Sequence, residues 1–196
     1  VNGSILNAGT IVFASANQKQ MDLVTGGLRH PSETPVNFAQ NKLVIIYPAD
    51  NPGKLANLAD LAKPGLKLVF AGSEVPVGQY SLDFLDKAEA SGFFVPGYKQ
   101  PVLANVVSYE NNVRAVLTKI QLGEADAGIV YQTDANSAAS DIELLTIPDE
   151  LNVIADYPIL ALPDGPAGEW GQTFVDFILS DAGQAVLKKY GFSPVQ

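Results

Sequence analysis

The sequence contains no cysteine, a single histidine (His30) and no long hydrophobic run. Without cysteine the chain has no disulfide, no thiol nucleophile and no cysteine-ligated metal. Its longest continuous apolar run, Leu43 to Tyr47, is far shorter than the roughly 20 residues that span a bilayer. No signal-like segment opens the sequence, so we expect the mature form if the protein is exported.

Positive charge is also scarce, because 12 Lys+Arg face 21 Asp+Glu and give a formal net charge of −9 at pH 7. This balance argues against nucleic acid as a partner. It also means that an anionic ligand must be held by local dipoles rather than by the overall field. Hydrophobic residues make up 47% of the 196 residues and charged residues 17%, as in a globular protein of one domain or two small lobes.

Catalytic and metal-binding motifs are absent from the sequence. It has no phosphate loop, dinucleotide fingerprint, zinc motif or Ser-His-Asp set. Glu110, Glu124 and Asp126 lack both the spacing of a metal site and the context of a catalytic carboxylate pair. We therefore expect neither an enzyme nor a cofactor.

The stretch from Leu66 to Ala90 predicts a strand, a tight turn and a helix. Residues 66–73 form a short apolar run, and Pro76 and Gly78 mark the turn that opens the helix. The N–H groups of a helix's first turn have no intrahelical partner, so this turn predicts an anion site that needs no cationic side chain. The alternative is a plain strand–helix connection. Residues at helical spacing predict the buried face: Val77, Tyr80, Phe84, Leu85 and Ala88.

Strand-type and helix-type segments alternate along the rest of the chain. The predicted strands cover 11–15, 43–47, 102–107, 126–131 and 142–147. The predicted helices cover 17–23, 55–62, 110–122 and two segments near the C-terminus. Loops are expected at 29–35, which holds His30, and at 92–100. This alternation predicts an α/β fold with mostly parallel sheets.

Two turn-rich crossings, near residues 48 and 157, predict two lobes. The outer lobe would comprise 1–47 and 158–196, and the inner lobe 48–157. Ligands of such sheets bind beyond the carboxyl ends of the strands. There we expect the turn at 75–78, the helix start at 111–114 and Tyr131 to converge into a small, uncharged, donor-rich concavity that suits a compact oxyanion.

Five segments resemble the molybdate-binding proteins of ABC importers, and the similarity runs in order from Ile11 to the end of the chain. The resemblance implies a two-lobed type II periplasmic-binding-protein fold, and a periplasmic or extracellular protein that hands molybdate or tungstate to an ABC permease in the membrane. The segments are V-F-A-S-A-N-Q-K-Q-M-D (12–22), E-V-P-V-G-Q-Y (74–80), Y-E-N-N-V-R-A-V-L (109–117), A-G-I-V-Y-Q-T-D (127–134) and L-K-K-Y-G-F (187–192).

The resemblance also implies a set of site residues. The backbone N–H groups of Val77 and Val113 and the hydroxyl of Tyr131 would bind the anion. Donor-only contacts favour a fully ionised dianion over a protonated phosphate. Without that context Tyr131 reads as a half-buried packing residue, and we favour a structural ion pair for Arg114 because helix dipoles supply the positive field. Four residues would support the site: Pro76, Gly78, Asn112 and Arg114.

The match to the family begins only at Ile11. Family members open with two strands and two serine-bearing loops that supply ligand hydroxyls from the outer lobe, and Val1–Thr10 does not match them. We therefore expect an incomplete outer lobe whose free sheet edge and apolar helix faces are covered by Val1–Thr10, by a second copy in a homodimer, or by a bound N-terminal fragment. Two alternative functions are a non-transporting remnant that serves as an interaction or structural module, and a related binding protein for sulfate or an organic anion.

Overall fold

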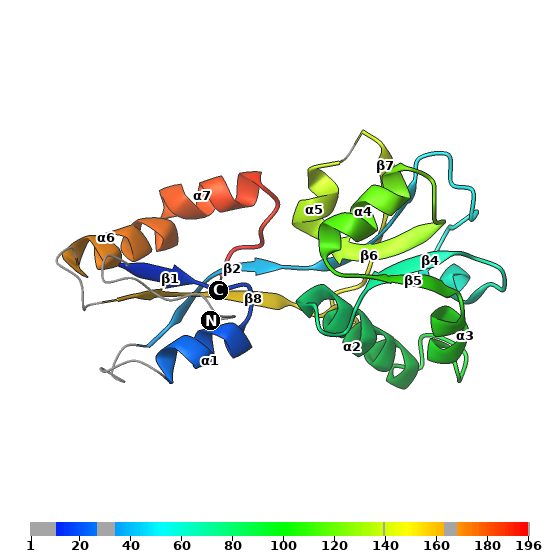
Figure 1. The fold of residues 1–196 in the computed structure, drawn as a ribbon, viewed down its shortest axis with the longest axis horizontal. Coiled ribbons are helices and arrows are strands. Elements are labelled where there is room, and N and C mark those ends of the chain that lie inside the picture. Colours follow the sequence, from blue (N-terminus) through cyan, green and yellow to red (C-terminus); the bar gives the residue numbers. More distant parts are fainter. Residues whose placement is uncertain (1–10, 27–33, 139, 163–167, 196) are drawn as a thin grey trace. The chain divides into compact units, whose positions relative to one another are not determined.

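The computed structural model describes residues 11–26, 34–138, 140–162 and 168–195, so the expectations for His30 and for Val1–Thr10 lie outside the described residues. The chain forms two α/β units, one comprising Val1–Asn41 and Ala155–Gln196 and the other Lys42–Ile154 (Figure 1). The predicted two-lobed α/β class is confirmed. The unit boundaries fall at 41/42 and 154/155 rather than at 47/48 and 157/158.

The first unit contains an antiparallel sheet of order β1-β8-β2. Its strands are β1 (Val12–Ala14), β8 (Ala155–Ala161) and β2 (Val36–Asn41). The segment expected as a return crossing is thus the central strand. Pro158 lies inside this strand opposite Asn37, and the β2 register shifts between Asn37 and Ala39. Since proline has no N–H to donate, a bulge in the facing strand accommodates it.

Three helices accompany this sheet, with α1 (Gln18–Thr25) on one face and α6 (Gly168–Leu179) and α7 (Asp181–Lys189) on the other (Figure 1). The side chain of Asn17 caps α1 by accepting the N–H of Gln20 at 2.9 Å. Met21 of α1 is fully buried with Leu160 and Leu162. The core of this unit therefore lies between α1 and the end of β8.

The second unit contains a five-stranded sheet of order β5-β4-β6-β3-β7. β4 is parallel to β5 and β6, whereas β3 is antiparallel to β6 and β7. The expectation of mostly parallel sheets is therefore wrong, because β3 and β8, the strands that follow the two unit boundaries, run against their neighbours. The strands are β5 (Val106–Glu110), β4 (Leu68–Ala71), β6 (Ala127–Tyr131), β3 (Leu43–Pro48) and β7 (Ile142–Thr146).

β3 belongs to this second sheet and not to the outer lobe, where the sequence placed it. Its residues from Leu43 to Ile46 are buried, as expected for a continuous apolar run in a sheet covered on both faces. Two helices supply the cover, α2 (Pro76–Ala90) on one face and α4 (Val113–Gln121) on the other (Figure 1).

The predicted loop at 92–100 and strand at 102–107 are wrong in part. Residues 99–104 form the helix α3 (Lys99–Ala104), and the strand begins only at Val106. Asn105 ends the helix, and its side-chain amide donates to the carbonyl oxygens of Leu61 and Lys63 at 2.9 and 2.7 Å. These tertiary hydrogen bonds fix the helix end, which the apolar run 102–107 does not reveal.

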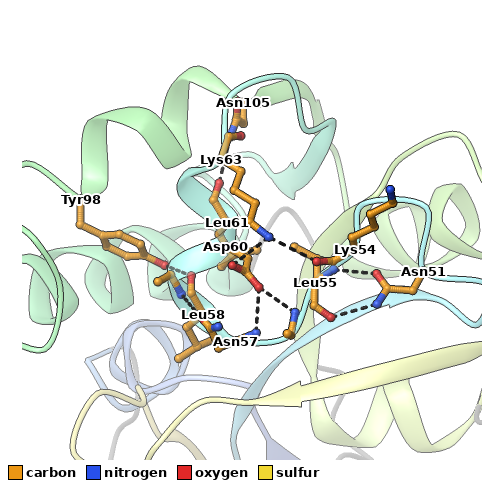
Figure 2. Close-up of polar contacts among 12 residues, drawn as sticks. Asn51, Lys54, Leu55, Asn57, Leu58, Asp60, Leu61, Lys63, Tyr98 and Asn105 are labelled. Atoms are coloured by element: carbon orange, nitrogen blue, oxygen red, sulfur yellow. Dashed lines mark hydrogen bonds and ion pairs between the residues drawn. The ribbon is translucent and has the colours of Figure 1, made fainter.

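The predicted helix at 55–62 is a shorter 3₁₀ helix, η1 (Leu58–Ala62), held by polar contacts (Figure 2). Asn57 begins it with a capping box, because its side chain accepts the Ala59 N–H at 2.9 Å while Asp60 accepts the Asn57 N–H at 3.1 Å. The buried Tyr98 hydroxyl donates to the Leu58 carbonyl oxygen at 2.6 Å. This hydrogen bond links η1 to the start of α3.

Candidate functional site at the carboxyl edge of the second sheet

Three adjacent parallel strands end at the same edge of the second unit's sheet. β4 lies between β5 and β6, and the pairing of Ala71 with Glu110 places the ends of β4 and β5 level. β4 leads into α2, β5 leads into α4, and β6 ends at Tyr131. The structure therefore brings Val77, Val113 and Tyr131 to one edge, at the point where the strand order reverses.

The start of α2 packs closely against the end of β4. Val75 is the N-cap and Pro76 occupies the first turn, where its missing N–H costs nothing. A Cβ added at Gly78 would lie 2.0 Å from the Gly72 carbonyl oxygen and 2.5 Å from that of Ala71. Glycine is therefore needed for this approach. It directs the first-turn N–H of Val77, which has no partner within a helix, and the positive end of the helix dipole to this edge.

The start of α4 reaches the same edge from the opposite face of the sheet (Figure 1). Asn112 is its N-cap and accepts the Ala115 N–H at 2.9 Å, so the N–H of Val113 is a first-turn donor. α4 lies close to β6, since a Cβ at Gly128 would be 2.7 Å from the Val116 side chain. Two helix N-termini thus meet at the carboxyl ends of the strands.

Tyr131 is a buried residue at the end of β6 that contacts α2. Its ring packs edge-on against the ring of Tyr80, with centroids 6.5 Å apart and an interplanar angle of 70°. The sequence indicated Tyr80 only as part of the buried face of its helix. The helical spacing gave no signal that this residue would contact the ring of Tyr131.

Arg114 directly follows Val113 in the first turn of α4 and lines a polar hollow of about 420 Å³ between α4 and α5 (Gln132–Asn136). Thr118, Asp134 and Ser137 also line this hollow. Burial raises the pKa of Asp134, while a backbone hydrogen bond and the charge of Arg114 act in the opposite direction. Arg114 therefore shares this hollow with the carboxylate of Asp134, and the structural ion pair stays a prediction.

The carboxylate of Glu110, at the end of β5, is paired with a cation. The ammonium of Lys119 lies 2.6 Å from Glu110 and donates to Ser108 at 3.0 Å. Hydrogen bonds from Lys119 and then from Ser108 lower the pKa of Glu110. Across the described ranges no group of three or more His, Asp or Glu side chains is placed to hold a metal ion.

The chain is thus a protein of two α/β units in which two helices begin at the carboxyl ends of the second unit's parallel strands. The chain matches the family model described as bacterial extracellular solute-binding protein over residues 10–193, and it belongs to that family. No helix in the described part of the chain is long and apolar enough to cross a bilayer.

Several similar proteins are named for molybdate or molybdenum. The chain is 36% identical to the molybdate-binding protein ModA of Mycobacterium tuberculosis over 183 residues, which are 93% of this chain and 65% of that relative. The substrate-binding domain of a putative molybdenum ABC transporter from Clostridium difficile has a TM-score of 0.79 at 25% identity, covering 97% of this chain and 79% of that one. The periplasmic molybdate-binding protein of Azotobacter vinelandii shares the fold, with a TM-score of 0.74 at 20% identity and coverage of 100% and 81%.

The sequence resemblance to this family is confirmed by these matches. The chain spans 65% of the length of the mycobacterial relative.

Proposed function

We propose that this chain acts as an extracytoplasmic solute-binding protein, which captures a tetrahedral oxyanion, molybdate or tungstate, and delivers it to an ABC permease. The observation that carries the proposal is the convergence of two helix N-termini and a buried tyrosine at one sheet edge. The names of the relatives support the choice of ligand.

In this proposal the ligand contacts are donors without formal charge: the N–H groups of Val77 and Val113 and the hydroxyl of Tyr131. The positive ends of the α2 and α4 dipoles favour an anion at this edge. A fully ionised dianion accepts from every donor, whereas a protonated phosphate would turn its own proton toward one of them and lose that bond. Pro76, Gly78 and Asn112 support these donors by fixing the starts of the two helices.

The proposed setting follows from the family. A protein of this kind works in the periplasm or at the outer cell surface and associates with the membrane through its transporter. It binds and releases its ligand unchanged, so we propose no catalytic residue and no cofactor.

Titration calorimetry with molybdate, tungstate, sulfate and phosphate tests the proposal. Tyr131→Phe removes a hydrogen bond to a charged ligand, which costs about 1.5–3 kcal/mol or roughly a tenfold to hundredfold loss of affinity. Arg114→Met should weaken binding less, because Arg114 lies in the hollow with Asp134. Tyr190→Phe is the matched control, since this tyrosine is exposed in the first unit.

The assignment is reversed if Arg114→Met abolishes binding while Tyr131→Phe has no effect. Heat of binding for sulfate and none for molybdate would assign the site to a different oxyanion.

A further inference from the structure

The short helix α5 begins directly after Tyr131, which is its N-cap residue. Asp134 is the third residue of this helix, and its half-buried carboxyl accepts a backbone hydrogen bond from Tyr131. A side chain at this position that reaches back to the N–H of the N-cap residue forms one half of a capping box. Asp134 therefore holds the backbone of the residue whose hydroxyl is a proposed ligand.

The direction of the Tyr131 N–H follows from the pairing of β6 with β3. The next residue, Gln132, donates its N–H to the Lys42 carbonyl oxygen at 2.8 Å. Hydrogen-bonded and non-hydrogen-bonded positions alternate in an antiparallel pair, so Tyr131, which lies opposite Leu43, is at a non-hydrogen-bonded position and its N–H points away from β3. On the other side of β6, β4 pairs with the first two residues of this strand. The carboxyl of Asp134 accepts where this strand pairing has ended.

The same carboxyl faces the start of α4. Asp134 and Arg114 both line the hollow between α4 and α5, and the charge of Arg114 acts on the Asp134 carboxyl. Among the described residues that line this hollow, these two alone carry a formal charge. Arg114 directly follows Val113, whose N–H is the other proposed donor on this side. One carboxyl is therefore bonded to the backbone of one donor residue and faces the chain neighbour of another.

The ionised carboxylate at this position does not serve stability. Burial raises the pKa of the Asp134 carboxyl, and the hydrogen bond from Tyr131 and the charge of Arg114 act in the opposite direction. Ionisation at neutral pH therefore costs the folded chain stability, and the uncharged amide of asparagine would have nearly the same shape without this cost. Groups that are retained against stability are typical of functional sites.

We propose that Asp134 is a positioning residue of the oxyanion site. It holds the Tyr131 backbone and the start of α4 in the geometry that directs the Tyr131 hydroxyl and the Val113 N–H toward one ligand. This inference rests on the proposed function of the sheet edge. Asp134 does not itself contact the anion, because a carboxylate repels a dianion, and the opposite charge of Arg114 leaves the hollow without net charge.

Calorimetric titration with molybdate and tungstate tests the proposal. Asp134→Asn keeps an acceptor for the Tyr131 N–H but loses the charge that faces Arg114, and Asp134→Ala loses both. We expect affinity to fall about threefold in Asp134→Asn and about tenfold in Asp134→Ala. Neither loss should exceed that of Tyr131→Phe, because the hydrogen bond from the hydroxyl is misdirected rather than removed.

The sign of the effect separates positioning from two other roles. Removing the negative charge would by itself favour an anion nearby, so a purely electrostatic role predicts tighter binding in Asp134→Asn. A merely structural role predicts that Tm and affinity fall together. We expect weaker binding without a lower Tm at neutral pH. Asp86→Asn is the matched control, because Asp86 is an exposed residue of α2 that pairs with Lys99, and it should leave the affinity unchanged.

The backbone amide signals of the ligand-free chain give a readout that does not depend on binding. In nitrogen–proton correlation spectra Asp134→Ala should shift the signals of Tyr131 and Val113, whereas Asp86→Asn should shift neither. If the wild-type chain binds no oxyanion, the proposed function fails, and these signals still decide whether Asp134 links the two donor residues. If Asp134→Ala does not fold, the same signals are compared in Asp134→Asn.

The proposal is overturned if the Asp134 variants bind the oxyanion as tightly as wild type or more tightly. It is also overturned if Tm and affinity fall together in Asp134→Asn, or if the Val113 signal does not respond to the substitution of Asp134.

Discussion

Gly78 offers a direct test of whether the first turn of α2 must pack on the end of β4. In an ordinary helix the change from glycine to alanine adds about 1 kcal/mol of stability, because it reduces the backbone freedom of the unfolded chain. At Gly78 the new Cβ would lie 2.0 Å from the Gly72 carbonyl oxygen and 2.5 Å from that of Ala71. Both are backbone atoms, so no side-chain rotation relieves the clash.

The cost of the clash should exceed the gain in propensity. Overpacking that forces backbone shifts costs typically 1–3 kcal/mol and occasionally more. Because both clashing atoms are backbone atoms, we take the upper half of this range and expect Gly78→Ala to lower the free energy of unfolding by about 1–2 kcal/mol net of the helix gain. Tm should then fall by roughly 2–8 °C. The same shift displaces the Val77 N–H, so oxyanion affinity should fall about tenfold or more, as for the loss of one charge-assisted hydrogen bond.

Gly183→Ala is the matched control in the first unit. Gly183 occupies the same third helical position in α7, and its Cβ would lie 2.3 Å from the Phe177 carbonyl oxygen. Differential scanning calorimetry should show a lower Tm for both variants. Calorimetric titration with molybdate should show weaker binding only for Gly78→Ala. A Gly78→Ala protein as stable as wild type, or equal loss of affinity in both variants, would refute the reasoning.

Three further changes test the polar contacts of the second unit. Tyr98→Phe removes the hydrogen bond to Leu58 and should cost about 1–2 kcal/mol in urea denaturation. Burial, and then the charge of Asp60, raise the pKa of the Tyr98 phenol, so the wild-type chain should lose stability above about pH 10 and Tyr98→Phe should lose less. The hydrogen bond from the Ala56 N–H and then the one from Lys63 lower the pKa of the Asp60 carboxyl, so the stability that ionised Asp60 contributes is lost below about pH 4. Asp60→Asn should therefore be less stable than wild type in urea titrations at neutral pH, and this difference should shrink in acid. Burial raises the pKa of the Asp134 carboxyl, so its ionisation destabilises the folded state once the pH rises above about 4. Asp134→Asn should therefore raise Tm at neutral pH but not in acid.

Local patterns predicted the elements that form the candidate site. The helix predicted over 110–122 corresponds to α4, whose face is apolar at helical spacing with Val116, Leu117 and Ile120 buried. Pro76 and Gly78 marked the start of α2, and the apolar run before Tyr131 marked β6. Each of these signals lies within a few residues of the feature that it predicts. The positions of the site residues at one edge then follow from the rule that parallel strands joined by helices share a carboxyl edge.

Elements set by distant contacts could not be predicted in this way. The run 102–107 has the composition of a strand, but the hydrogen bonds from Asn105 to Leu61 and Lys63 end a helix there. β2 alternates polar and apolar residues only at its start. Its bulge lies opposite a proline in β8, which is more than a hundred residues later in the sequence. In both places the deciding partner lies far away in the sequence.

Strand direction is the clearest case of information that local patterns do not contain. An apolar run such as Leu43 to Ile46 is equally suited to a parallel or an antiparallel position inside a sheet covered on both faces. β3 is antiparallel to β6 and β7 because it enters the second unit from β2 without a crossover helix, whereas α2 and α4 return the chain for the parallel pairs. The sheet that carries the donors therefore owes its parallel part to those two helices. Since the same helices supply the N–H groups of Val77 and Val113, the topology that orders the strands also creates the candidate anion site.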